Sequence, residues 1–166
     1  MKSREIGLLG KLLGDWTVDL AAKMPDGTSL RGKGTARSTE LSLERGIRTE
    51  IRLDVEGMGA YHEDDLWGFD QWDKKIHFYS ITSSGAVHDH SGTWKDNKTL
   101  ELHWRGLYEG KPTTEDVVIT FAGDNEIRVH EVDMSDGQSG PVFDYILKKQ
   151  WDLDKTAPLV QSMLIL

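Results

Sequence analysis

The chain has 166 residues, 37% hydrophobic and 29% charged, a composition typical of one globular domain with a sizeable core. Its formal net charge of -8 opposes binding to nucleic acid and to anionic membrane surfaces, so we expect neither partner. Cysteine is absent, which excludes disulfides, thiolate zinc sites and cysteine nucleophiles and is typical of a cytoplasmic protein.

The N-terminal segment predicts a short helix and no targeting signal. Ile6, Leu9 and Leu13 recur at the spacing of one helical face, and Gly14 is typical of a helix end. Charged residues interrupt any apolar run long enough for a signal peptide, and no later stretch reaches the length of a membrane span. We expect this helix to cap the mouth of the fold.

Beyond the helix, apolar and polar residues alternate with a period of two, which is the pattern of half-buried strands. The alternation is clearest in residues 16–24, 47–55 and 100–105. Stretches rich in Gly, Asp, Asn and Pro separate such runs and predict turns at 25–29, 56–60, 70–75, 95–98, 122–126 and 135–141. Counting the runs between the turns predicts about ten strands, most of them joined as hairpins.

These strands predict an all-β fold, because no helical pattern lies between them to make parallel crossovers. We expect one domain over residues 1–166: a closed antiparallel up-and-down barrel over about 14–152, followed by a C-terminal tail over 153–166. A β-sandwich with Greek-key connections is the alternative. The run Arg31–Ala36 is rich in glycine and basic residues, but it lies inside a strand pattern, so we expect close-packing or bulge glycines there.

Three motifs carry a family resemblance that covers roughly residues 8–150. Leu12–Val18 holds the Gly-x-Trp pattern with which lipocalin-like barrels open their first strand, Leu66–Asp70 is similar to a Gly-aromatic-Asp hairpin corner, and Ser91–Trp94 to a Gly-Thr-aromatic step. In this order they resemble an uncharacterised domain-of-unknown-function family of small lipocalin-like (calycin, nitrobindin-like) proteins. The resemblance implies a ten-stranded barrel with a central cavity and a tryptophan at its closed end.

Nitrobindins bind haem through a histidine on a late strand, so the resemblance raises haem as a cofactor. Here the glycines that should follow the first-strand tryptophan are missing, and only His130 occupies a late strand. We therefore predict no cofactor. A small, partly apolar ligand is the expected partner, and we expect the cavity to be lined by Trp16, Leu53, Trp67, Phe78, Leu102 and Trp104.

His88 and His90 are spaced to share one strand face. A two- or four-residue loop after this strand places His90 opposite His103 and His88 opposite Arg105, a cluster that suits a divalent metal. A three-residue loop sends His103 to the other face. With a two- or four-residue loop, Val87, Leu100, Leu102 and Trp104 form an apolar face opposite the histidines, so we expect the histidines to face solvent and predict no specific metal site.

The run Tyr61–Trp67 brings at least one carboxylate inward whichever face is buried. If Glu63 and Asp65 are buried together, one of them has a raised pKa and can act as a general acid. We favour a solvated acidic rim strand. The alternative function is thus an isomerase, lyase or hydrolase that uses Glu63, Asp65, His88, His90 and Arg105, although no nucleophile elbow or phosphate-binding loop is present.

The C-terminal tail predicts a contact with another surface. Leu159, Val160, Met163 and Leu164 recur at helical spacing after Pro158, which suits a first helical turn. So short a helix is unstable alone, and its exposed apolar side chains favour docking. We predict that the tail packs on an outer apolar patch, with a homodimer as the favoured partner.

Overall fold

The computed structural model describes residues 3–42 and 45–150, which form two short helical turns and ten strands. The expected tail therefore lies outside the described residues. The elements are α1 (Arg4–Leu9), η1 (Gly10–Leu12), β1 (Gly14–Lys23), β2 (Ser29–Glu40), β3 (Gly46–Val55), β4 (Gly59–Asp70), β5 (Lys75–Thr82), β6 (Val87–Trp94), β7 (Thr99–Tyr108), β8 (Lys111–Phe121), β9 (Glu126–Ser135) and β10 (Gln138–Lys149).

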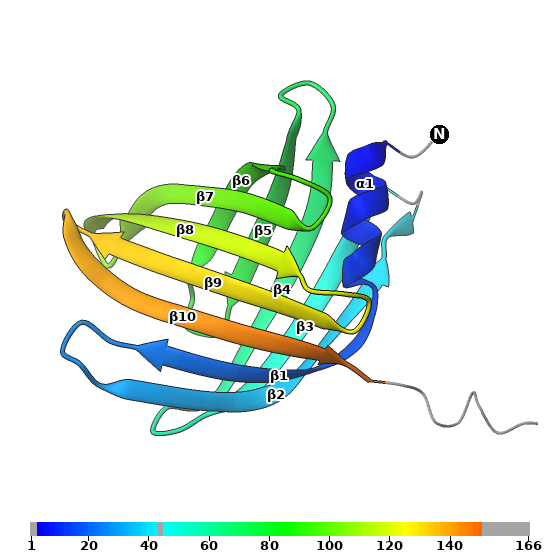
Figure 1. The fold of residues 1–166 in the computed structure, drawn as a ribbon. Coiled ribbons are helices and arrows are strands. Elements are labelled where there is room, and N and C mark those ends of the chain that lie inside the picture. The colour runs from blue at the N-terminus through cyan, green and yellow to red at the C-terminus, as the bar shows by residue number, and fades with distance from the viewer. Residues whose placement is uncertain (1–2, 43–44, 151–166) are drawn as a thin grey trace, which may run out of the picture.

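The ten strands form one closed antiparallel barrel in which each strand pairs with its neighbours in sequence, and β10 returns to pair with β1 (Figure 1). The predicted up-and-down barrel is confirmed, and the sandwich alternative is wrong. Closure follows from the alternation, since each strand has one apolar face to bury and a closed sheet leaves no free edge. Each of the six predicted turns overlaps a connection between consecutive strands, although the last one extends into β10.

The N-terminal helix covers an end of the barrel, but this is the closed end at Trp16 and not the mouth. Ser3 begins α1 by accepting a hydrogen bond from the backbone N–H of Ile6 at 3.2 Å. Leu9 and Leu12 are buried in the core, and the indole N–H of Trp16 donates to the carbonyl of Leu12 at 2.8 Å. Trp16 thereby ties the helical segment to the inside of β1, and the barrel is plugged at this end.

Strand β3 shows why the alternation is informative. Ile47, Leu53 and Val55 are buried in the core, whereas Arg48 and Arg52 on the other face are exposed. On β2, Gly34 packs tightly on β3, because a Cβ at this position would lie 1.8 Å from the carbonyl oxygen of Arg52. The close-packing interpretation of Arg31–Ala36 is confirmed at this glycine.

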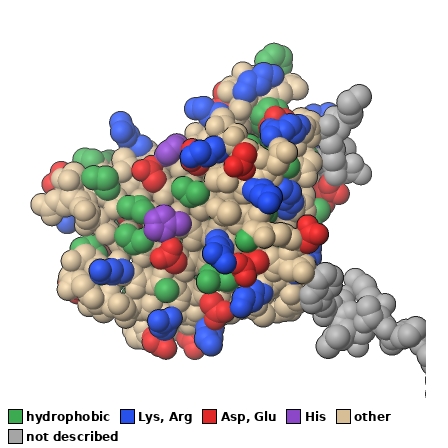
Figure 2. Space-filling view, in the orientation of Figure 1, with side chains coloured by type: hydrophobic (Ala, Val, Ile, Leu, Met, Phe, Trp, Pro, Cys, Tyr) green, Lys and Arg blue, Asp and Glu red, His purple; other side chains and the backbone are tan. Residues whose placement is uncertain are grey.

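On the face of the barrel shown in Figure 2, acidic and basic side chains are interspersed. Several of them form exposed ion pairs, such as Arg48 with Asp64 at 2.9 Å and Lys95 with Glu101 at 2.8 Å. The two helical segments that the structure describes are too short to cross a membrane.

Candidate ligand cavity

The barrel encloses a cavity of about 310 Å³, a volume at the lower end of the range for small-molecule sites. Its floor is made by Leu12 and Trp16 at the closed end. At the other end it is lined by Met58 and Tyr108, which are 69% and 43% exposed and therefore mark the mouth. The apolar part of the wall comes mainly from β1, β3, β8 and β10, with Val18, Leu20, Ile51, Leu53, Val117, Ile119, Phe143 and Leu147.

The rest of the wall is polar and includes a cluster of acidic side chains. Five carboxylic side chains line the cavity together with two imidazoles, and no Lys or Arg is among the described residues that line it. Because a buried charge is costly unless it is paired or hydrogen-bonded, this inner wall cannot be explained as ordinary core packing. The seven side chains are Glu63, Asp65, His88, His90, Glu115, Glu131 and Asp133.

Strand β4 contributes the first group of polar side chains. Tyr61, Glu63 and Asp65 all point inward, and the hydroxyl of Tyr61 donates to the Oε2 atom of Glu63 at 2.7 Å. Asp65 is 1% exposed, and burial, followed by the nearby charge of Glu63, raises the pKa of this carboxyl well above its ordinary value. The expectation of a solvated rim strand is wrong, because β4 pairs with both β3 and β5.

Strand β6 contributes the histidines, and here the expected orientation is wrong. Trp94 pairs with Leu100 and Ser91 with His103, so an odd number of residues, 95–99, separates the paired positions 94 and 100. Asp96 sets this loop by accepting hydrogen bonds from the backbone N–H groups of residues 98 and 99. The odd loop puts His88 and His90 on the inner face and His103 on the outer face.

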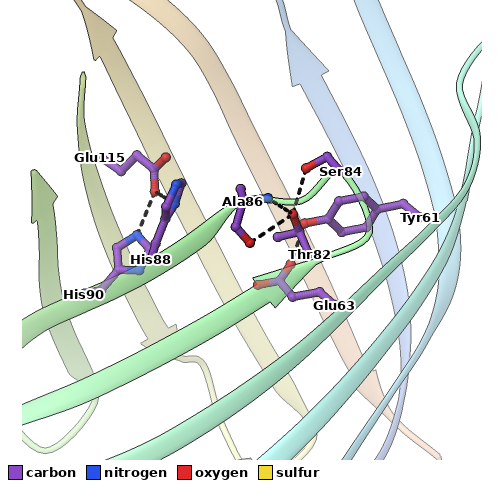
Figure 3. Close-up of polar contacts among 8 residues, drawn as sticks. All are labelled: Tyr61, Glu63, Thr82, Ser84, Ala86, His88, His90 and Glu115. Atoms are coloured by element: carbon purple, nitrogen blue, oxygen red, sulfur yellow. Dashed lines mark hydrogen bonds and ion pairs between the residues drawn. The ribbon is translucent and has the colours of Figure 1, made fainter. Parts of the chain in front are cut away.

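His88 and His90 both reach the same carboxylate oxygen. The Nδ1 atom of His88 and the Nε2 atom of His90 each lie 2.9 Å from the Oε2 atom of Glu115 on β8 (Figure 3). Burial alone would raise the pKa of Glu115, but the two histidine hydrogen bonds outweigh it and hold this pKa below its ordinary value. Glu115 is thus ionised, and because a carboxylate only accepts, both nitrogens carry a proton.

Strand β9 adds two more carboxyls and β10 a phenol. Burial and the charge of Asp133 raise the pKa of Glu131 well above its ordinary value. Burial and the charge of Glu115 raise the pKa of Asp133 to about 7. Burial and the charge of Glu131 raise the pKa of Tyr145. The wall therefore holds the protonated acids Asp65 and Glu131 beside the ionised Glu115, and it can donate as well as accept hydrogen bonds.

Four of the six expected lining residues do line the cavity: Trp16, Leu53, Trp67 and Phe78. The rings of Trp67 and Phe78 stack at 4.1 Å, and His90 lies 5.0 Å from Phe78. Leu102 and Trp104 are not among the lining residues. Both belong to β7, and the His88–Glu115–His90 contact from β6 to β8 passes over this strand.

Arg105, His103 and His130, which the sequence indicated as candidate site residues, all lie on the outer face of the barrel. Arg105, a candidate for catalysis, is exposed on the outer face of β7. His103 contacts Asp116 at 2.6 Å there. His130 on β9 contacts Asp144 at 2.7 Å with 53% of its side chain exposed, so it points away from the cavity and does not fit the late-strand haem ligand that the resemblance implies.

The sequence analysis missed Glu115, Glu131 and Asp133, although the same alternation contains the signal. In β8, Glu115 shares its face with the buried Val117 and Ile119. In β9, Glu131 and Asp133 follow Ile127 and Val129 on one face. In each strand, every second residue lies on the inner face. Continuing this alternation from the apolar residues to the charged ones would have placed all three carboxyls inside.

Several solved structures share this fold. Rv2717c from M. tuberculosis is 16% identical over 91% of this chain and 100% of that chain, with a TM-score of 0.71. The S-type phycobiliprotein lyase CPES from Guillardia theta is 10% identical over 87% of this chain and 92% of that chain, with a TM-score of 0.67. At these identities the likeness shows the lipocalin-like barrel fold alone. No protein-family model matches the chain, and no curated protein matches it. Membership of the uncharacterised family stays a prediction.

Proposed function

We propose that this protein binds one small, partly apolar molecule inside the barrel. The observation that carries the proposal is the division of the cavity wall into an apolar part around Trp16 and Leu53 and an acidic part around Glu63 and Glu115. Concave sites with mostly apolar walls and a few convergent polar groups are typical of small-molecule binding. The apolar body of the ligand lies toward the closed end in this arrangement, and its polar end meets the acidic wall.

The charge of the wall selects the polar end of the ligand. Glu115 is ionised, and no Lys or Arg among the described lining residues offsets its charge. An anionic ligand is repelled in such a site, whereas a protonated amine or another hydrogen-bond donor is attracted. The proposed ligand class is therefore an apolar amine.

A matched pair of ligands tests the proposal. Titration of the tryptophan fluorescence with n-octylamine and with octanoate, in buffer that contains EDTA, compares one chain length with two opposite charges. We expect saturable binding of the amine and at least tenfold weaker binding of the carboxylate. Glu63→Gln inside the barrel should weaken amine binding, and Asp64→Asn on the outer face serves as the control. Absence of saturable binding, or equal binding of both ligands, would contradict the proposal.

A second candidate function is acid–base catalysis by an isomerase, lyase or hydrolase. The observation that favours it is the convergence of Glu63 and Asp65 inside the cavity, where Asp65 has a raised pKa and can serve as a general acid. Incubation with a mixture of small metabolites, followed by NMR, separates the two functions. Catalysis predicts a change in the mixture that Asp65→Asn abolishes and Asp64→Asn leaves intact. A mixture that stays unchanged favours binding alone.

Two further expectations stay predictions: cytoplasmic localisation, and a homodimer contact through the tail. Truncation after Asp154 with sedimentation analysis tests the dimer. We expect the truncated chain to lose the dimer. An unchanged oligomeric state and melting temperature would contradict the role of the tail.

A further inference from the structure

We propose that His88, His90 and Glu115 form a binding site for a divalent transition-metal ion of the zinc type inside the barrel. The proposal goes beyond small-molecule binding, because it requires no organic ligand. The ligand atoms of the three side chains all lie within 4.8 Å of one another, and the three residues are 9%, 4% and 6% exposed. We refer to them as the inner triad.

The strand geometry explains how the inner triad forms across three strands. His88 and His90 share the inner face of β6 because they are two residues apart, and Glu115 reaches them from β8. β7 lies between β6 and β8, and the ring of its Trp104 would separate Glu115 from the histidines if it stood upright on the sheet. Instead the ring folds over Gly106, where a Cβ would lie 2.3 Å from Trp104 Cζ2, and stacks on His88 at 3.7 Å.

The donor set matches the chemistry of a metal centre. Two imidazole nitrogens and one carboxylate oxygen are the protein ligands of many catalytic zinc sites, which keep a fourth position open for water or substrate. Donor atoms at about 2.0–2.2 Å from a tetrahedral metal ion lie about 3.4 Å from one another. The two nitrogens of the inner triad lie 2.9 Å from the Glu115 oxygen, so they need to move apart by only about half an ångström.

Metal binding requires a proton shift in each imidazole, and it agrees with the charge of the wall. Each coordinating nitrogen must give up the proton that it now donates to Glu115, and this proton moves to the other ring nitrogen. In His90 that atom is Nδ1, which is buried and has no hydrogen-bond partner among the described residues. A dication also offsets the carboxylates of a cavity whose described lining residues include no Lys or Arg.

A second cluster, Asp70, Asp73 and His77, lies on the exterior and provides an internal comparison. His77 contacts Asp73 and Asp89 at 3.1 Å each, but the two carboxylates of the cluster are exposed. Water competes for such ligands, whereas the three residues of the inner triad are at most 9% exposed. The geometry therefore favours the interior site.

Cobalt absorption tests the inner triad directly. The full chain is treated with EDTA, exchanged into chelator-free buffer and titrated with Co²⁺, whose visible bands report four- or five-coordinate binding. We expect one equivalent of Co²⁺ to bind and Zn²⁺ to abolish the bands by competition. Glu115→Gln and His88→Phe should each weaken Co²⁺ binding at least about 100-fold, since even outer-shell changes cost about 10–100-fold.

Matched variants on the exterior complete the experiment. His103→Ala alters an exposed histidine–carboxylate pair, and His77→Ala removes the exterior cluster. Both should bind Co²⁺ like the wild type. Melting curves check that each variant is folded, and His88→Phe keeps a ring against Trp104 if Glu115→Gln does not fold. The proposal is overturned if the wild type gives no bands, if either inner variant binds normally, or if His77→Ala abolishes binding.

Discussion

The sheet formed by β6, β7 and β8 carries a histidine–carboxylate contact on each of its two faces. Inside, His88 and His90 meet Glu115 at 2.9 Å, and outside, His103 meets Asp116 at 2.6 Å. Glu115 and Asp116 are neighbours in sequence, yet the first is 8% and the second 62% exposed in its side chain. The same pair of side-chain types is thus an ordinary surface ion pair on one face and a shielded polar site on the other.

The comparison shows that burial, more than distance, determines how much such a contact contributes to the stability of the fold. The outer pair is screened by water and contributes little to folding. The inner contact holds an ionised carboxylate in the interior, where losing one partner leaves the others unsatisfied. Three pairs of matched substitutions separate these cases, since each changes one residue inside the barrel and one on its surface.

The largest difference is expected between Glu115→Ala and Asp116→Ala. Glu115→Ala leaves two buried N–H groups without their acceptor and should lower the free energy of unfolding by about 3 kcal/mol. Asp116→Ala should lower it by less than about 1 kcal/mol. Urea denaturation of both variants at pH 7 measures the two values. Equal values would show that the inner contact has no special weight.

A smaller difference is expected between Gly106→Ala and Gly123→Ala. A methyl group at position 106 meets the ring of Trp104 and must displace it from His88, whereas position 123 has open space. We expect a cost of about 2 kcal/mol for the first, as for other overpacked sites, and less than about 0.5 kcal/mol for the second. Thermal denaturation gives the stabilities, and near-UV circular dichroism reports the tryptophan environment. A normal near-UV spectrum for Gly106→Ala would contradict this prediction.

The smallest difference concerns pH and compares Asp65→Asn with Asp64→Asn. Burial raises the pKa of Asp65, so the folded protein keeps a proton that the unfolded chain releases above the ordinary value of 3.8. Stability from this group is therefore complete at low pH and falls as the pH rises through the raised pKa. Asp65→Asn should stabilise the protein by about 1 kcal/mol or more at pH 8 and have little effect near pH 4.

Asp64 provides the outer control for the pH experiment. It faces solvent on the same strand, where Arg48 donates to it at 2.9 Å. Asp64→Asn should cost less than about 1 kcal/mol and should leave the fall of stability with pH unchanged. Denaturation curves at pH 4, 6 and 8 decide the comparison, and an Asp65→Asn variant whose stability falls with pH as steeply as that of the wild type would contradict it.

The barrel could be predicted from the sequence because its strands repeat one simple pattern. Ile47, Leu53 and Val55 alternate with charged residues, and a turn signal follows them at Glu56–Ala60. The floor of the cavity was predictable from the Gly-x-Trp motif, and Trp16 lies where that motif implies. These features are local, so each of them can be predicted from the sequence of a single strand and its turn.

The polar wall could not be predicted in the same way, because it depends on the register between strands. The faces of β6 carry histidines on one side and Val87, Asp89 and Ser91 on the other, so hydrophobicity alone does not choose between them. The choice follows from the odd-length loop that Asp96 organises, and one residue more or fewer reverses every side chain. Likewise, the folding of Trp104 over Gly106 is a packing effect between residues that the alternation does not distinguish.

The plug of α1 and Trp16 at one end of the barrel imposes an order of filling. Because this end is closed, a ligand can reach the apolar floor only through the mouth. It must therefore pass His88, which lies near Tyr108 at the mouth. A ligand bound as proposed, with its apolar end on this floor, would enter with that end first and leave with its polar end first. Occupants nearer the mouth are therefore the last to arrive and the first to go, and they set the residence time of everything beneath them.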